Sequence, residues 1–287
     1  MADINDKTIL HVDKLNISYV NSNNEERIIV KDGSFKVNSG EIVLIIGENG
    51  SGKSSIFRSI VGDIEQNLTS SIKLFFKNLF NKKKVKYVHS KEMCFLGEKV
   101  DSEQKLDNLK RSIGFSKQED DIDSFYERKV WNYVLDYASH SKDYSLLSTK
   151  ELEKEVQEVY DGLYCEKYCD GKLKKMRLKK CSGGEKKIVS ILSALSRKKS
   201  KLFIFDEPIN NLDAFHARKL NNYLVDLKNQ KDAPGILIIT HCPMFLSVDK
   251  VYELKKGTLI EKNKNDYIAK SCFGKCSLTN KEKYEEE

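Results

Sequence analysis

The chain has 287 residues, and its 50 Lys and Arg against 43 Asp and Glu give a formal net charge of +7. Hydrophobic residues at 39%, with 13 Phe and 13 Tyr, argue against a disordered chain. The longest apolar runs, Ile42 to Ile46 and Ile236 to Ile239, are much shorter than the roughly 20 residues of a membrane-spanning helix. Met1 to Lys7 resemble neither a secretion signal nor a transit peptide. We therefore expect a cytosolic protein with one large domain.

The first 61 residues predict short strands followed by a helix. Apolar or alternating runs separated by polar turns indicate strands at Ile9 to Tyr19, Ile28 to Val30, Ser34 to Val37 and Glu41 to Ile46. Ser54 to Val61 has helical spacing, with its apolar residues on one face.

The rest of the chain alternates between helices and apolar strands around a long polar section. Helical patterns are expected around 125–138 and 148–160, at Ile188 to Leu195 and at Phe215 to Leu227, and strands at Leu202 to Phe205 and Ile236 to Ile239. Buried strands alternating with helices predict an α/β fold with a mostly parallel sheet covered on both faces. The section 119–180 should form a helical subdomain, and the charged residues 263–287 should form a frayed tail.

A glycine-rich loop, Gly47-Glu-Asn-Gly-Ser-Gly-Lys53-Ser54, joins the predicted strand to the first helix. Glycines let successive backbone N–H groups approach phosphate oxygens, and the helix N-terminus adds partial positive charge. Lys53 would reach the β- and γ-phosphates, and Ser54 would ligate Mg²⁺. The expected nucleotide-binding residues are Gly47, Glu48, Asn49, Gly50, Ser51, Gly52, Lys53, Ser54 and Ser55.

Two strand ends supply the side chains for catalysis. The strand before Asp206 and Glu207 is apolar, and ligands of α/β proteins bind at the carboxyl ends of such strands. Asp206 suits the Mg²⁺ shell, and Glu207 can polarise an attacking water. A second apolar strand ends at His241, which should lie at the same sheet edge. A second loop of small residues, Cys181 to Glu185, opens a helix and so forms another anion-binding helix end.

These motifs, in this order, resemble the nucleotide-binding domain of ATP-binding-cassette (ABC) proteins over roughly residues 9 to 262. The glycine-rich loop matches Walker A, Leu202 to Glu207 match Walker B with its catalytic glutamate, and Cys181 to Glu185 match the signature motif. Further matches are Tyr19 for the aromatic that stacks on adenine, Gln118 for the Q-loop, Asn210 to Asp213 for the D-loop and His241 for the switch histidine. The resemblance implies a P-loop NTPase fold of the ABC type, with a mostly parallel core sheet, an antiparallel β subdomain and an α-helical subdomain.

The resemblance also implies a mechanism that needs two cassettes. Two copies, or one copy and a second ABC ATPase, would pair head to tail, and each ATP would lie between Walker A of one and the signature loop of the other. Ser182, Gly183, Gly184 and Glu185 would reach the γ-phosphate of the partner's ATP, and Asp213 would couple the two sites. Gln118 would sense Mg²⁺ and water, and His241 would bridge the γ-phosphate and Glu207.

Two motifs depart from the family pattern. Cys181 and Glu185 stand where Leu and Gln are usual in the signature, and Asn210 and Asn211 replace small residues of the D-loop. Because Ser182 and the glycines are intact, we expect altered affinity rather than loss of activity. Glu207 and His241 are also intact, which favours hydrolysis over binding alone.

The segment 72–91 is a basic insertion that the resemblance does not explain. Ser70 to Lys91 contain seven lysines and no acid, and apolar residues recur at helical spacing from Ile72 to Phe80. Ile72, Leu74 and Phe76 also alternate as in a strand, so periodicity leaves both a helix and a strand open at 72–77. A basic amphipathic segment suits an anionic membrane surface or a partner protein. The favoured interpretation is an elaborated edge of the antiparallel subdomain with solvated lysines. Nucleic-acid binding is disfavoured because the net charge is mild.

Seven cysteines in a cytosolic chain indicate reduced thiols rather than a disulfide framework. The pairs Cys165/Cys169 and Cys272/Cys276 could present four thiolates to zinc, but buried thiols fit better because no CxxC motif accompanies them.

The expected function is that of an ATP-hydrolysing subunit at the cytoplasmic face of a membrane, which powers a permease on a separate chain. One alternative is a soluble cassette that drives a non-transport assembly, such as iron–sulfur cluster biogenesis. A nucleotide-gated binding module without turnover is the other.

Overall fold

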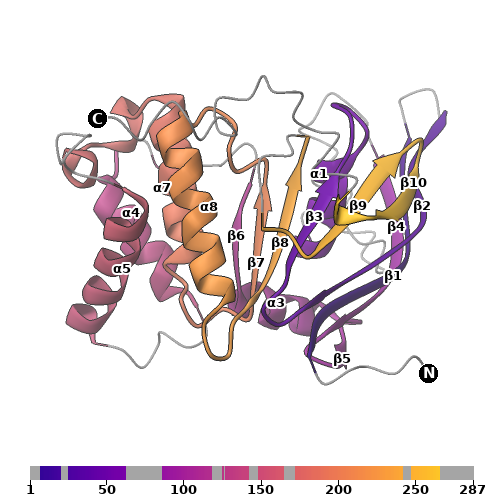
Figure 1. Cartoon of the computed structure of the whole chain (residues 1–287), viewed down its shortest axis with the longest axis horizontal. Coiled ribbons are helices and arrows are strands. Elements are labelled where there is room, and N and C mark those ends of the chain that lie inside the picture. Colours follow the sequence, from indigo (N-terminus) through magenta and orange to yellow (C-terminus); the bar gives the residue numbers. More distant parts are fainter. Residues whose placement is uncertain are drawn as a thin grey trace.

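The computed structural model describes residues 7–20, 25–62, 86–117, 125, 127–141, 148–164, 172–241 and 247–265. A six-stranded sheet lies at its centre, in the order β10-β9-β3-β8-β7-β6 (Figure 1). Within this sheet the strands are parallel from β9 to β6, and β10 pairs antiparallel with β9. The bounds are β3 (Ile42–Ile46), β6 (Ile113–Ser116), β7 (Leu202–Asp206), β8 (Gly235–Thr240), β9 (Lys250–Lys255) and β10 (Thr258–Lys262). Every residue of β7 and β8 is buried, as strands covered on both faces require.

A second, antiparallel sheet has the order β2-β1-β4-β5. Its strands are β1 (Thr8–Val20), β2 (Glu26–Asn38), β4 (Lys86–Phe95) and β5 (Glu98–Lys99). The prediction of two strands, at Ile28 to Val30 and Ser34 to Val37, was wrong, because both belong to the single strand β2. The polar residues between them form an irregularity in the β1–β2 ladder, where Lys14 and Asp32 have φ of 49° and 48°. Asn16 stabilises it by accepting a hydrogen bond from the backbone N–H of Asp32 at 3.0 Å.

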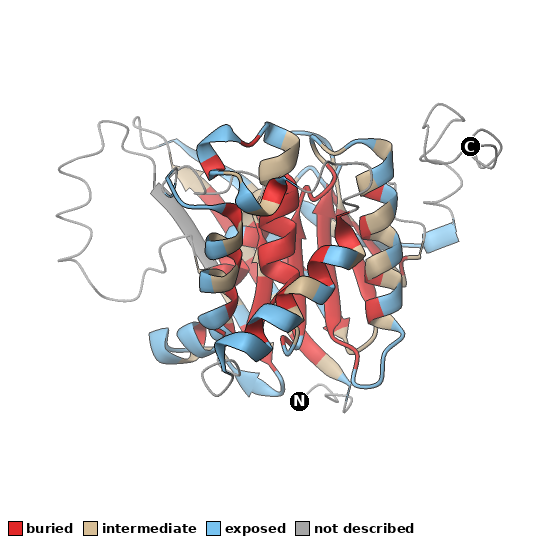
Figure 2. Ribbon diagram, turned by 90° about the vertical axis from the view of Figure 1, so that its left-hand side faces the viewer, coloured by how far each residue is buried: buried red, intermediate tan, exposed pale blue. Residues whose placement is uncertain are grey.

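Helices cover the central sheet on both faces, and the alternation of its side chains divides the core into two clusters. Val43 and Ile45 of β3 pack with α1 (Lys53–Val61), α3 (Glu103–Ser112) and the antiparallel sheet. Leu44 packs on the other face with α4 (Val130–Ser139), α5 (Thr149–Leu163), α7 (Gly183–Leu195) and α8 (Ala214–Lys228). Two short 3₁₀ helices, η2 (Leu173–Lys175) and η3 (Leu178–Lys180), precede α7. Figure 2 shows the buried residues concentrated in the central strands and on the helix faces turned toward them.

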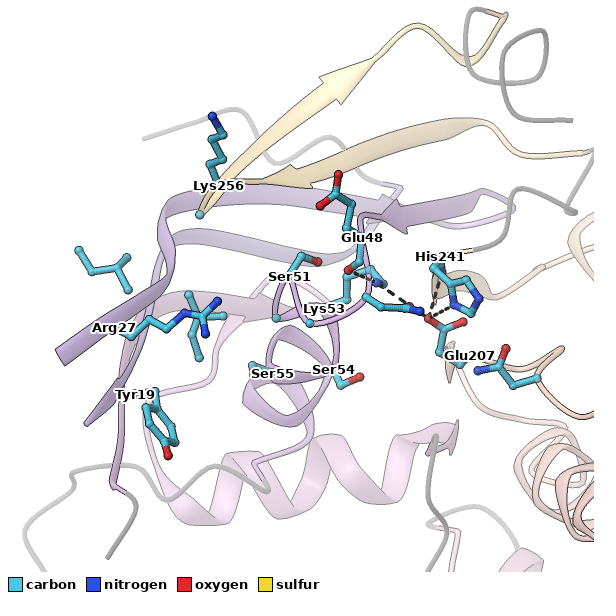
Figure 3. Close-up of a pocket in the computed structure, with 17 residues that line it drawn as sticks. Tyr19, Arg27, Glu48, Ser51, Lys53, Ser54, Ser55, Glu207, His241 and Lys256 are labelled. Carbon is cyan, nitrogen blue, oxygen red and sulfur yellow. Dashed lines mark hydrogen bonds and ion pairs between the residues drawn. The ribbon is translucent and has the colours of Figure 1, made fainter. Parts of the chain in front are cut away.

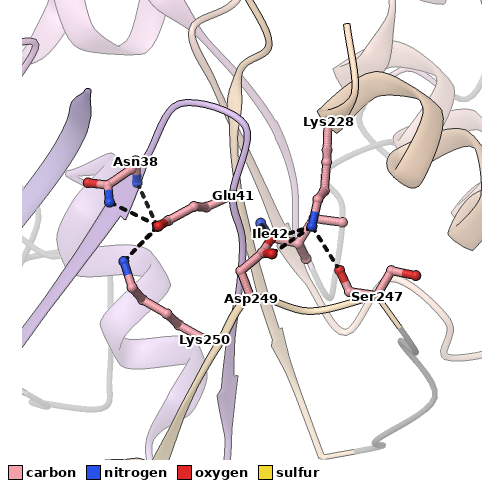
Figure 4. Close-up of polar contacts among 7 residues, drawn as sticks. All are labelled: Asn38, Glu41, Ile42, Lys228, Ser247, Asp249 and Lys250. Carbon is pink, nitrogen blue, oxygen red and sulfur yellow. Dashed lines mark hydrogen bonds and ion pairs between the residues drawn. The ribbon is translucent and has the colours of Figure 1, made fainter. Parts of the chain in front are cut away.

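An ion pair and a backbone hydrogen bond fasten the start of β3 to the start of β9 (Figure 4). Lys250 Nζ lies 2.7 Å from Glu41, whose carboxylate also accepts a hydrogen bond from the Asn38 amide. Asp249 accepts a bond from the backbone N–H of Ile42 at 2.8 Å and pairs with Lys228 of α8 at 2.6 Å. The parallel pairing of β3 with β9 is therefore fixed by side chains at its first residues.

The architecture confirms the predicted fold class, with a mostly parallel core sheet, an antiparallel sheet and a helical layer. The helical patterns around 125–138 and 148–160 correspond to α4 and α5. α3, β6, β9 and β10 were not predicted, because α3 is highly charged and the strands are short or carry charges.

Several predicted features fall outside the residues that the structure describes: Gln118, residues 72–85 of the basic insertion, the cysteine pairs 165/169 and 272/276, and the tail from 266. Residues 86–91 of the insertion belong to β4, which pairs with β1. This agrees with the interpretation of that end of the segment as part of the antiparallel subdomain. None of the helices in the described ranges is long and apolar enough to cross a membrane.

Candidate nucleotide-binding site

The glycine-rich loop connects β3 to α1 and curls over the start of the helix (Figure 3). Gly50 and Gly52 have φ of 77° and 105°, which residues with a Cβ rarely adopt. A Cβ on Gly52 would also lie 2.0 Å from Cγ2 of Ile29, so β2 packs directly against the loop. Position 52 therefore requires glycine both for its backbone conformation and for lack of space.

Lys53, the first residue of α1, is buried, and its ammonium group is held by the loop itself. Nζ donates to the carbonyl oxygens of Gly47 and Glu48 at 2.8 and 2.9 Å and lies 4.0 Å from Oε1 of Glu207. Burial lowers the pKa of Lys53, and the nearby Glu207 and Asp206 carboxylates oppose that shift. The cation thus lies between the loop and the end of β7, where phosphate oxygens could bind it.

Asp206 ends β7 and is 2% exposed. Burial raises the pKa of its carboxyl to about 6, while a hydrogen bond with the Ser54 side chain acts in the opposite direction. Its Oδ1 is buried and accepts no hydrogen bond from the described residues. A buried carboxylate oxygen without a donor, beside a serine hydroxyl, is a donor set that fits Mg²⁺, which takes one or two protein oxygens together with phosphates and waters.

Glu207 is held rigidly although its backbone φ is 48°. Its backbone N–H donates to the Ile239 carbonyl at 2.7 Å, which anchors it to β8. Its carboxylate accepts hydrogen bonds from the Thr240 hydroxyl at 2.8 Å and from the His241 N–H at 3.0 Å. Nδ1 of His241 lies 2.8 Å from the same carboxylate. The structure therefore brings Glu207 and His241 together as the sequence predicts, and it adds Thr240.

A cleft of about 870 Å³ runs from these catalytic candidates to the antiparallel sheet (Figure 3). Tyr19 lies at the far end beside Arg27, its register partner on β2. The cleft is also lined by most of the predicted loop, by Glu207 and by His241. Asn210, which the D-loop match already included, lines the cleft as well. Residues that the sequence reasoning missed are Thr240, Arg27, Ile28, Ile29, Lys256 and Gly257. Thr240 could have been found as the neighbour of His241 at a strand end, whereas no motif marks the others.

The signature residues are not brought to this cleft. They begin α7, which packs on the opposite face of the central sheet from α1 (Figure 1). Ser182 caps the helix: its Oγ accepts from the backbone N–H of Glu185 at 3.2 Å, and the Glu185 carboxylate accepts from the N–H of Ser182 at 2.7 Å. Glutamate in the usual glutamine position thus completes a capping box. Ser182 and Gly183 are exposed.

Cys181 and Asp213 both have local structural partners. Cys181 is buried, and burial raises the pKa of its thiol to about 11, so it is an unreactive packing residue. Asp213 caps α8 by accepting from the backbone N–H of His216 at 2.8 Å, and its carboxylate lies 2.8 Å from Nδ1 of the same histidine. Within the described residues, no group of three or more His, Cys, Asp or Glu forms a metal cluster.

The family model described as ABC transporter matches residues 30–210 of the chain. The phosphonates import ATP-binding protein of Fusobacterium nucleatum is 29% identical over 256 residues, which cover 88% of this chain and 91% of that protein. The energy-coupling factor transporter ATP-binding protein EcfA of Malacoplasma penetrans is 26% identical over 266 residues, or 92% of this chain and 79% of that protein.

Solved structures agree with these sequence relationships. CbiO1 from Clostridium perfringens, part of the ABC transporter complex CbiONQ, superimposes with a TM-score of 0.65 at 26% identity and covers 92% of each chain. A dimeric bacterial ABC transporter cassette gives a TM-score of 0.69 at 19% identity over 89% of this chain and 98% of that chain, which shows the shared fold. The family match, the ordered motifs and the fold together establish that this chain belongs to the ABC transporter family.

Proposed function

We propose that this chain binds and hydrolyses ATP, pairs with a second cassette when ATP is bound, and powers a transmembrane permease carried on a separate chain. The observation that carries the proposal is the position of Glu207, buried between Lys53 and the end of β8 and aligned by Thr240 and His241. A carboxylate in this position beside a phosphate-binding lysine suits polarisation of a water for attack on a γ-phosphate.

The residues of the cleft divide into three roles in this proposal. Backbone N–H groups of the glycine-rich loop and Lys53 bind the phosphates, Tyr19 stacks on adenine, and Glu207 with His241 acts on the attacking water. Ser54 and Asp206 would hold Mg²⁺, which supplies positive charge to the phosphates when bound. Gln118 is assigned to water and metal sensing by resemblance alone.

A second cassette is needed because the signature loop lies away from the chain's own cleft. Ser182, Gly183, Gly184 and Glu185 would contact the ATP of a partner cassette, either a second copy or another ABC ATPase, and Asp213 would face the junction. Binding of ATP would close this pair, and hydrolysis would loosen it. The relatives' names support an ATP-binding subunit of a transporter; the first names phosphonates as what it imports, and the second names no substrate.

We further propose that residues 1–262 form the ATPase domain, with the helical subdomain at about 119–180, the insertion at about 72–91 and the tail from 263. The chain would act in the cytoplasm at a membrane surface, through the permease and through the basic insertion. Deleting residues 72–85, which leaves β4 intact, should weaken membrane association without reducing ATP binding.

Comparison of the wild type with Glu207→Gln tests the proposed reaction. We expect ATP turnover in the wild type, and in the variant a loss of turnover with accumulation of an ATP-bound dimer, measured by light scattering. Equal turnover in both would dismiss Glu207 as the catalytic carboxylate.

The partner distinguishes transport from the alternative function, a soluble cassette that serves an assembly such as an iron–sulfur cluster scaffold. Purification from solubilised membranes should recover an integral membrane protein with the chain. Recovery of a soluble scaffold alone would favour the alternative.

A further inference from the structure

Lys187 lies in the first turns of α7, two residues after the signature loop, and is buried with 5% exposure. Its ammonium group donates to the carbonyl oxygen of Lys117 at 2.8 Å and to that of Asp206 at 3.0 Å. Lys117 directly follows β6, and Asp206 is the last residue of β7. A single side chain of the signature helix therefore links the carboxyl ends of two neighbouring parallel strands.

Further polar contacts continue along the same side of α7. The hydroxyls of Ser190 and Ser116 are 2.7 Å apart and buried. Arg197, just beyond the end of α7, donates to the carbonyl of Ile113 at 2.9 Å. Positions 187 and 190 lie one turn apart on α7, so this face of the helix and Arg197 after it are bonded to β6 from the start of the strand to the residue after its end.

These contacts lie directly before two residues of the proposed hydrolytic site. Residue 117 precedes Gln118, and Asp206 precedes Glu207. Hydrogen bonds from a charged donor are stronger than neutral ones, and two of them from one ammonium fix the spacing between the two carbonyls. A shift of α7 would therefore displace the backbone at Lys117 and at Asp206, directly before Glu207.

We propose that Lys187 is a positioning residue for hydrolysis, which holds the backbone carbonyls of Lys117 and Asp206 in register with the signature helix. This inference rests on the proposed ATPase function. Lys187 is not among the described residues that line the nucleotide cleft, so it acts through Asp206 and the adjoining Glu207 rather than on ATP. Its loss should impair turnover more than nucleotide binding.

The test compares Lys187→Met, which removes both hydrogen bonds, with Lys187→Gln, whose amide keeps two donors. Lys201→Met is the matched control, because Lys201 is an exposed lysine just before the other end of β7. Thermal unfolding and the binding of a fluorescent ATP analogue show whether each variant is folded. ATP turnover is then measured against ATP and against Mg²⁺ concentration.

We expect Lys187→Met to lower kcat about 30-fold while KM for ATP changes less than about threefold, and Lys187→Gln to recover most of that loss. Lys201→Met should match the wild type. Equal turnover of Lys187→Met and Lys201→Met would overturn the inference. It would also be overturned if Lys187→Met and Lys187→Gln lost thermal stability and turnover to the same extent, because Lys187 would then have a purely structural role. A wild type without turnover would overturn the proposed function as well, so the two failures are distinguishable.

Discussion

The backbone carbonyl oxygen of Asn211 lies so close to Gly184 that a Cβ built on the glycine would be 2.7 Å from it. The D-loop and the signature loop of the same chain are therefore in direct backbone contact. Asn211 has φ of 65°, so the loop that presents this carbonyl is itself constrained. A substitution at either residue should therefore disturb the backbone of the other.

Gly184→Ala should destabilise the nucleotide-free protein by about 1–3 kcal/mol, because its methyl group must displace the Asn211 carbonyl. Gly183→Ala is the matched control, since a Cβ there meets nothing within 4 Å of the described chain. Urea unfolding of both variants measures the difference. Equal free energies of unfolding would show that the D-loop moves to make room for the methyl group without loss of stability.

Thr240→Val should reduce ATP turnover by about tenfold with little change in KM, because Glu207 loses a hydrogen bond that aligns its carboxylate. Thr240→Ser keeps the hydroxyl and should retain most activity. Steady-state kinetics of both variants measure kcat and KM for ATP. Wild-type turnover of Thr240→Val would contradict the prediction, because it would show that the hydrogen bond from Thr240 to Glu207 is dispensable.

Glu185→Gln should strengthen the ATP-dependent pairing of two cassettes several-fold. In the proposed pair the Glu185 carboxylate lies near the negative phosphates of the partner's ATP, and the substitution removes that repulsion. Glutamine can keep the capping box, so the start of α7 should remain formed. The measurement is the ATP concentration needed for half-maximal dimer in the Glu207→Gln background, where turnover does not interfere. Weaker pairing in the double variant would show that the Glu185 carboxylate assists the contact.

Lys91 should make stability depend on pH above neutrality. Burial lowers the pKa of this lysine to about 8, and its ammonium group donates to the Ser59 carbonyl of α1. Between pH 8 and the ordinary lysine pKa, the unfolded chain binds more protons than the folded one, so this group's contribution to stability increases as pH rises.

Between pH 7 and pH 10.5 the free energy of unfolding of the wild type should therefore rise by on the order of 3 kcal/mol relative to that of Lys91→Met. Lys31→Met, a change of an exposed strand lysine, serves as the control and should show no such trend. Chemical unfolding at the two pH values gives the comparison. If the difference in free energy of unfolding between the wild type and Lys91→Met were the same at both pH values, the pKa of Lys91 would not be lowered in the folded protein.

The sequence predicted those parts of the fold and site that depend on local patterns. The glycine-rich loop, Asp206, Glu207 and His241 stand next to apolar strands, so their meeting at one sheet edge followed from parallel topology. Arg27 and Lys256 reach the cleft only because the antiparallel sheet and the β9–β10 turn pack beside the loop, and no local pattern encodes that packing. The bulge at Lys14 and Asp32 was misread as a strand break because its polar residues resemble a turn.

The pairing of β3 has a consequence for synthesis of the protein. The strand that carries the glycine-rich loop lies between β8 and β9, which are among the last elements of the chain, and its first residues are fastened to Asp249 and Lys250. The apolar side chains of β3 therefore stay uncovered on the ribosome until β8 and β9 have been synthesised. Truncated or stalled chains that end before β9 would leave this strand with an open edge, which makes them aggregation-prone and natural targets for chaperones.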